Sequence, residues 1–211
     1  MPRYTSTSSK RLGKQVFMTA SAFSVRPNAD DPATLIALFN ALFMPTMRTE
    51  LVFGGDEPLY KPANSKCSTH RIIFARGYFS SALHEISHWC IAGYERRQLE
   101  DYGYWYIPDG RDASQQHAFE QVEVKPQAVE CLLAEACGRA FHVSVDNLEG
   151  DVEVDRDAFT QKVSAQAEQY RTHGLPPRAE VLFQAFNDFY INGLSVSDVA
   201  EKQLPVISAL R

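Results

Sequence analysis

Apolar residues recur at helical spacing near the start of the chain and again around residue 85. The first stretch predicts a helix that is capped by Asp31, has Pro32 in its first turn and ends with the help of Pro45. The second predicts a helix over residues 78–92, closed by a glycine cap at Gly93. Each helix has one apolar face that we expect to pack in the core: Leu35, Ile36, Phe39, Leu42 and Phe43 in the first, and Phe79, Leu83, Ile86, Trp89, Cys90 and Ile91 in the second.

The rest of the chain mixes strand-like and helical patterns. Short runs of β-branched and aromatic residues predict strands at 51–53 and 71–74, joined by a loop, and an extended aromatic segment at 102–107. Helical periodicity returns in a short helix at 113–119, a longer one from Pro126 to about Cys137, two more at 157–173 and 178–191, and a last short helix capped by Ser197. Residues 1–28 lack any such pattern and predict a flexible N-terminal tail. Residues 29–211 are then expected to form one helix-rich α+β domain with a small sheet.

Composition agrees with a single packed domain and narrows the choice of partner. The chain has 211 residues, of which 45% are hydrophobic, which is enough for a core. A formal net charge of -5 argues against nucleic-acid binding through a broad basic surface. No apolar run approaches the roughly 20 residues that are needed to cross a bilayer. The four cysteines contain no Cys-x-x-Cys pair, so we expect free thiols in a reducing compartment.

The most informative motif is His84-Glu85-Ile86-Ser87-His88, in the second predicted helix. Two histidines four residues apart lie on one face of a helix, one turn apart, and can share a metal ion. Glu85 lies about 100° further round the helix and should flank the metal, as does the general base of metalloproteases. Burying two histidines and a glutamate in an otherwise apolar helix needs a reason, which favours a metal site over an incidental pair.

Two imidazoles leave a metal ion under-coordinated, so a third ligand is expected downstream. Glu120 and Glu123 are the main candidates, and His117 and Glu130 are weaker ones. We favour Glu123 because it lies just before the helix expected at Pro126, and the end of an element positions a side chain better than the middle of a loop. Two histidines and one carboxylate occur in catalytic zinc hydrolases and in non-haem iron(II) oxygenases, and ligand types alone do not separate the two classes.

The aromatic run Tyr102-Gly-Tyr-Trp-Tyr106 is the second unusual feature. Alternating aromatic residues are typical of a strand with one buried face. The functional alternative is one wall of an active-site cleft, in which Tyr104, Asp109 and Arg111 contact the substrate.

These motifs together resemble the elongation factor P hydroxylase family. The resemblance rests on His84-Glu-Ile-Ser-His-Trp89, Gly93, Arg96-Arg97, Asp101-Tyr-Gly-Tyr-Trp-Tyr106, Pro108-Asp-Gly-Arg-Asp112 and Phe119-Glu-Gln-Val-Glu-Val-Lys-Pro-Gln-Ala128, and extends from about Asp31 to the C-terminal helices. It implies a cytoplasmic bacterial enzyme that hydroxylates a lysine of translation elongation factor P to which a β-lysyl group has been added. The implied fold resembles the metal-dependent endoribonucleases of ribosome maturation, a zincin-like arrangement. The implied metal ligands are His84, His88 and either Glu120 or Glu123.

On this interpretation the chain is a metal-dependent hydroxylase whose protein partner is elongation factor P. The metal would be iron(II), with zinc as the alternative, and Glu85 would orient a ligand or a proton carrier. Acids would meet the cationic lysyl end of the substrate: Asp101, Asp109 and Asp112. The sequence shows no motif for binding 2-oxoglutarate, so the electron donor stays open. The main alternative function is a zinc-dependent peptidase or ribonuclease with Glu85 as general base.

Overall fold

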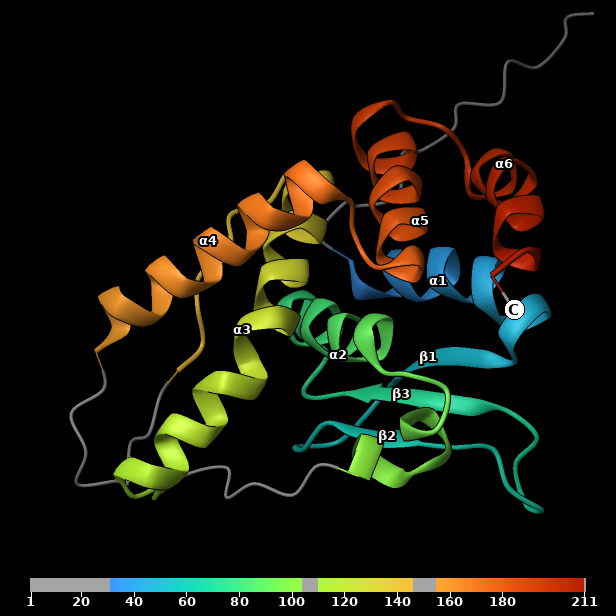
Figure 1. Ribbon diagram of the computed structural model, residues 1–211. Helices are drawn as coiled ribbons and strands as arrows, with labels where there is room; N and C mark the ends of the chain where they lie inside the picture. The colour runs from blue at the N-terminus through green and yellow to red at the C-terminus, as the bar shows by residue number, and fades with distance from the viewer. Residues whose placement is uncertain (1–30, 104–109, 146–154, 211) are drawn as a thin grey trace, which may run out of the picture.

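The computed structural model describes residues 31–103, 110–145 and 155–210 (Figure 1). The helices in these segments are α1 (Pro32–Met47), α2 (Phe79–Ile91), α3 (Ala113–Ala136), α4 (Arg156–His173), α5 (Pro177–Phe186) and α6 (Val196–Ser208). The strands are β1 (Thr49–Phe53), β2 (Leu59–Lys61) and β3 (His70–Phe74). Short 3₁₀ turns at Arg96–Gln98 and Glu100–Gly103 and a π-helical turn at Asn187–Ile191 complete them. The expected helix-rich α+β architecture with a small sheet is confirmed.

The small sheet and helices α1, α3 and α5 surround α2, the helix that carries the two histidines. The strand order is β1-β3-β2, with β1 parallel and β2 antiparallel to β3. α2 packs against β3, α1, α3 and α5, and α4 runs along α3 (Figure 1). Because α2 is covered on several sides, polar side chains on its inner face lie within the fold rather than in bulk water. None of the described helices combines the length and the apolarity that crossing a membrane requires.

Helix α1 and strands β1 and β3 follow the predicted pattern, with two local corrections. Asp31 caps α1 by accepting a hydrogen bond from the Ala33 N–H, as expected. Pro45, however, lies within α1, which ends only where Arg48 adopts a left-handed conformation (φ 50°). β2 was missed altogether, because a three-residue strand carries almost no periodicity of its own.

The glycine cap expected after α2 is also wrong. The residue that follows α2 is Ala92, which is extended (φ -61°, ψ 123°), and the chain leaves the helix without a left-handed residue. Gly93 is not among the glycines with positive φ, so no backbone strain requires glycine there.

The largest correction concerns α3, which was expected to be two helices. The structure has one helix, Ala113–Ala136, that runs through Pro126 and begins with a capping box between Asp112 and Gln115. A proline removes one backbone donor, but the helix has buried residues both before Pro126, such as Glu123, and after it, such as Val129, and it packs against its neighbours on both sides of the lost bond. Glu123 is therefore in the middle of a helix and not at a helix start.

The C-terminal helices were predicted closely. α4 and α5 occupy the two expected stretches, and α5 passes into the π-helical turn. The last helix is capped by Ser195, through a capping box with Asp198, and not by Ser197 as expected. Ser195 makes the cap because its backbone is still extended (φ -75°, ψ 161°), whereas Ser197 already lies within the helix.

The aromatic segment is only partly described. Tyr102 is not extended as predicted but left-handed (φ 57°), because its buried ring stacks on Tyr60 at 4.3 Å while the Asp101 carboxylate accepts a hydrogen bond from the Tyr60 N–H. Tyr104 and Asp109 lie outside the described residues, as does the predicted tail at 1–28.

Replacing Trp89 by alanine should lower the free energy of unfolding by about 3–5 kcal/mol. Trp89 is fully buried and meets Phe39 and Phe43 edge-on, with ring centroids 5.4 Å and 4.8 Å away. Urea denaturation measures the loss. Tyr94→Ala is the matched control, because the Tyr94 side chain is exposed and its removal should change stability by less than about 0.5 kcal/mol. Equal losses in the two variants would contradict a core role for Trp89.

Candidate metal site

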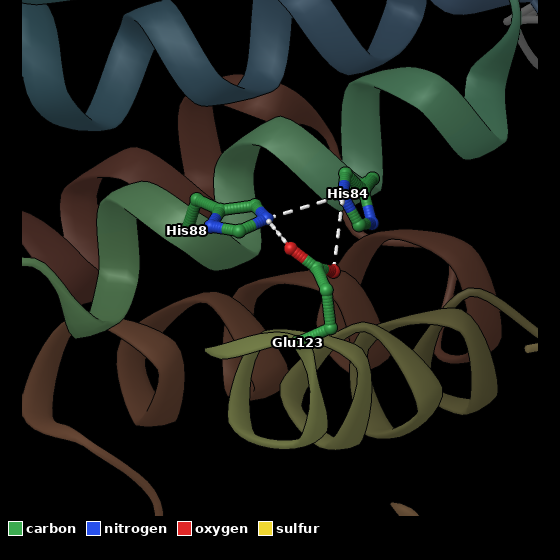
Figure 2. Close-up of side chains that lie close together, drawn as sticks. All are labelled: His84, His88 and Glu123. Atoms are coloured by element: carbon green, nitrogen blue, oxygen red, sulfur yellow. Dashed lines mark hydrogen bonds and ion pairs between the residues drawn. The ribbon is translucent and has the colours of Figure 1, made fainter. Parts of the chain in front are cut away.

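Two elements far apart in the sequence bring three potential metal ligands together. His84 and His88 come from α2 and Glu123 from α3 (Figure 2). The Nε2 atoms of the two histidines lie 3.1 Å apart. Glu123 places Oε1 3.2 Å from His88 Nε2 and Oε2 3.6 Å from His84 Nε2. One ligand atom from each residue lies within 4.8 Å of the others.

The three side chains do not satisfy one another completely. Glu123 is only 1% exposed, and its Oε1 atom makes no hydrogen bond within the described part of the chain. The two Nε2 atoms face each other, and one of them must be protonated for the contact to be a hydrogen bond. A cation at the point where these atoms converge would satisfy the buried carboxylate and both nitrogen lone pairs. The arrangement is therefore consistent with a bound divalent metal ion.

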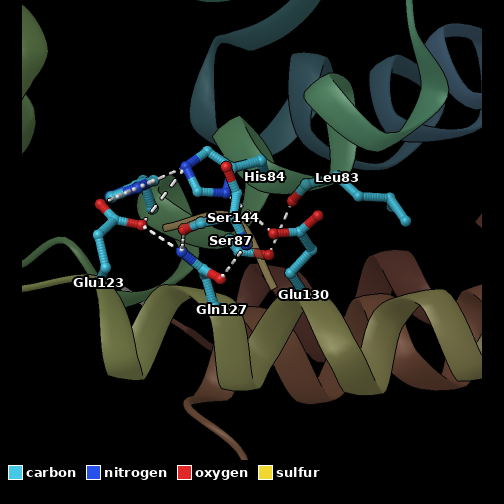
Figure 3. A network of polar contacts seen from close by, with 8 residues as sticks. Leu83, His84, Ser87, Glu123, Gln127, Glu130 and Ser144 are labelled. Carbon is cyan, nitrogen blue, oxygen red and sulfur yellow. Dashed lines mark hydrogen bonds and ion pairs between the residues drawn. The ribbon is translucent and has the colours of Figure 1, made fainter. Parts of the chain in front are cut away.

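Two further polar residues of α3 hold this group in place, and sequence reasoning did not assign either role. The Gln127 amide donates to Glu123 Oε2 at 3.2 Å and exchanges two hydrogen bonds with the Ser144 backbone (Figure 3). Glu130 Oε2 lies 2.9 Å from His84 Nδ1, on the other side of the imidazole from Glu123. The spacing of 123, 127 and 130 would have revealed one helical face, but only if the helix had been expected to continue through Pro126.

The charges within the site shift the pKa values of both His84 and Glu123. Burial by itself would lower the pKa of His84, but the hydrogen bond that His84 donates to Glu130 and the charge of Glu123 outweigh it and raise that pKa to about 10. Burial would raise the pKa of Glu123, yet His88, His84 and the Gln127 amide hold it at about 2. In the metal-free protein His84 is therefore protonated at neutral pH, while Glu123 is ionised.

Metal affinity is expected to rise with pH in the neutral range. A metal ion must displace the His84 proton, and because the pKa of His84 is about 10, that proton is present throughout this range. Each unit of pH should then strengthen binding about tenfold, until the curve flattens near the pKa of His84. Competition with a fluorescent zinc chelator between about pH 6 and about pH 8 measures the slope. A flat profile would contradict proton displacement.

Glu120 and His117, which were also considered as ligands, occupy different surroundings. Glu120 pairs with Lys162 of α4 at 3.0 Å, and His117 is exposed and contacts Gln121 at 2.8 Å. Neither belongs to the group of potential ligands found among the described residues.

Glu85 is partly buried on α2 beside the histidines. Burial raises its pKa and the negative charges of Glu123 and Asp101 add to this, while His84 and His88 oppose it. A carboxyl group in such surroundings accepts and returns a proton more readily near neutral pH than an exposed one.

Of the three residues expected in a cleft wall (Tyr104, Asp109 and Arg111), only Arg111 lies among the described residues. It is 2% exposed, donates from Nε to Gln116 Oε1 at 2.8 Å, and places its guanidinium 3.9 Å from the centroid of the Phe119 ring. These contacts tie the segment before α3 to the helix itself. A substrate contact by Arg111, Tyr104 or Asp109 stays a prediction.

Two comparisons place the chain among known proteins. The sequence profile of the family described as Elongation factor P hydroxylase matches residues 38–199. A protein from Haemophilus influenzae named Elongation factor P lysine hydroxylase is 53% identical over 156 residues, which cover 74% of this chain and 87% of the relative. The matched region of the family profile includes the whole of α2 and α3, and with them His84, His88 and Glu123.

Proposed function

The chain belongs to the elongation factor P hydroxylase family, and we propose that it hydroxylates a lysine side chain of elongation factor P at the site formed by His84, His88 and Glu123. The observation that carries this proposal is the convergence of three ligand atoms from α2 and α3. The target lysine would already carry a β-lysyl group, and the reaction would take place in the cytoplasm, where translation occurs. Residues 29–211 would form the hydroxylase domain, with a zincin-like relation between the histidine helix and the sheet.

The residues at the site fit an iron(II) ion, with zinc as the alternative. Two histidines and one carboxylate leave open coordination positions, and iron held by such a set supplies the activation of molecular oxygen in non-haem oxygenases. The buried Glu123 carboxylate would offset part of the charge of the ion, and His84 and His88 would hold it together with Glu123. Glu85, beside them, would orient a ligand or move a proton.

The charges around the site favour a cationic side chain. Four carboxyl groups lie around the two imidazoles: Glu85, Asp101, Glu123 and Glu130. These carboxyl groups would favour the amino groups of a lysylated lysine over an anionic side chain. An acidic or phosphorylated substrate would be repelled by the same groups.

Mass spectrometry of elongation factor P tests the proposal most directly. Elongation factor P isolated from cells that lack this protein should be lighter, by the mass of one oxygen atom, than the same protein from cells in which the gene is restored. Restoring the gene with His84→Ala should leave elongation factor P light. Identical masses in all three strains would overturn the assignment.

Glu85→Gln is expected to slow hydroxylation only moderately. A zinc hydrolase would lose its general base in this variant, at a cost of about 10²–10⁴ in rate. A hydroxylase does not need Glu85 to activate an attacking water, and the amide keeps the shape of the side chain. Hydroxylation of lysylated elongation factor P and cleavage of peptide and RNA should be assayed together. Cleavage by the wild type that Glu85→Gln abolishes would favour the hydrolase, although neither matching name describes one.

A further inference from the structure

The two nitrogens of His84 have different partners. Nδ1 lies 2.9 Å from Glu130 Oε2, whereas Nε2 faces His88 and Glu123 (Figure 3). The two nitrogens lie on different sides of the imidazole ring, so a carboxylate on Nδ1 cannot share an ion that is bound by Nε2. Glu130 therefore stands behind the histidine, relative to the candidate metal position, and not in the ligand group.

The contact between Glu130 and His84 is shielded from water by the position of Glu130 in the fold. Glu130 is buried, and it comes from α3, the helix that also carries Glu123. Glu123 and Glu130 are separated by seven residues, or about two helical turns, so they project from the same face of α3. Between them, Gln127 anchors that face to the Ser144 backbone. The same face of α3 thus places Glu123 at the candidate metal position and Glu130 beside His84 Nδ1.

We propose that Glu130 is a positioning residue that orients His84 for metal binding; the proposal rests on the metal site in the proposed function. The carboxylate accepts a hydrogen bond from the Nδ1–H of His84, and this fixes the tautomer in which Nε2 carries a free lone pair. The same bond stops rotation of the ring and makes Nε2 a stronger donor to a cation. The carboxylate contributes these effects without touching the metal or the substrate.

Titration with Co²⁺, followed by its visible absorbance, tests the proposal without reference to activity. Glu130→Ala should bind Co²⁺ about 10 to 100-fold more weakly than the wild type. Glu130→Gln should lose less, because the amide oxygen still accepts from Nδ1–H but carries no charge. The matched control is Glu135→Gln on the same helix, since Glu135 is exposed, pairs with Arg171 and should not affect binding.

Exchange of the His84 Nδ1–H proton with water distinguishes a role in orienting His84 from a role only in packing α2 against α3. With saturating Zn²⁺, the Nδ1–H proton of His84 should give a protected NMR signal in the wild type. That signal should exchange rapidly with water in Glu130→Ala and be partly restored in Glu130→Gln. Thermal unfolding of each metal-free variant shows that it is folded, and the isosteric Glu130→Gln carries the test if the alanine variant is not.

The results distinguish failure of the positioning role of Glu130 from failure of the metal site itself. Wild-type affinity and an unchanged His84 signal in both Glu130 variants would overturn the positioning role while the metal site stands. Equal Co²⁺ binding by the wild type and by His84→Ala would overturn the metal site, and the positioning role with it. Weakened binding together with loss of the Nδ1–H signal supports both.

Discussion

Replacing either His84 or His88 by alanine should abolish metal binding and hydroxylation of elongation factor P while the fold survives. The two imidazoles supply two of the three atoms that converge at the site, so the loss of one leaves too few ligands for tight binding. α2 is held in place by its buried apolar residues, among them Ile86 and Trp89, and does not depend on the histidines for packing. The Glu123 carboxyl, deprived of a partner, can take up a proton instead of remaining as an unpaired buried charge.

The matched control for the histidine variants is His117→Ala. His117 is an exposed histidine on α3 that lies outside the group of potential ligands, so its removal should leave metal binding and activity unchanged. Calorimetric titration with Zn²⁺ measures the affinity, and circular dichroism shows whether each variant is folded. Full affinity in folded His84→Ala or His88→Ala would refute the site.

Replacing Glu123 by glutamine should weaken metal binding well beyond the roughly 10 to 100-fold that is typical of residues behind the ligands. Glutamine keeps the shape of the side chain and removes the negative charge that a divalent ion needs. Glu123 is almost completely buried beside the two histidines, and it is the carboxylate in the group of potential ligands found among the described residues.

Glu120→Gln is the comparison that makes the Glu123 result specific. Glu120 lies one helical turn before Glu123, but it pairs with Lys162 near the surface. Loss of such a pair changes stability by about 0–1 kcal/mol and should leave the affinity for the metal close to that of the wild type. The same Zn²⁺ titration on both variants ranks them. The reverse ranking would move the ligand role to Glu120.

The sequence by itself determined the local parts of this protein. The Asp31 cap, the helix at 79–91 and the pairing of His84 with His88 on one helical face could all be predicted, because each depends on residues within one or two turns. The motifs around them also pointed to the family that the comparisons identify. Sequence reasoning favoured Glu123 over Glu120 as well, but for a mistaken reason, since it placed Glu123 at the start of a helix.

Only the tertiary structure decided which acids lie beside the histidines. Local rules ended a helix at Pro126, whereas packing against α2 and α4 stabilises a continuous α3 that tolerates the lost hydrogen bond. That continuity puts Glu123 and Glu130 on one face, one on each side of His84, while Glu120 pairs with α4. Contacts between helices some forty residues apart in sequence leave no periodic signal along the chain, because they depend on how the two helices cross and not on either helix alone.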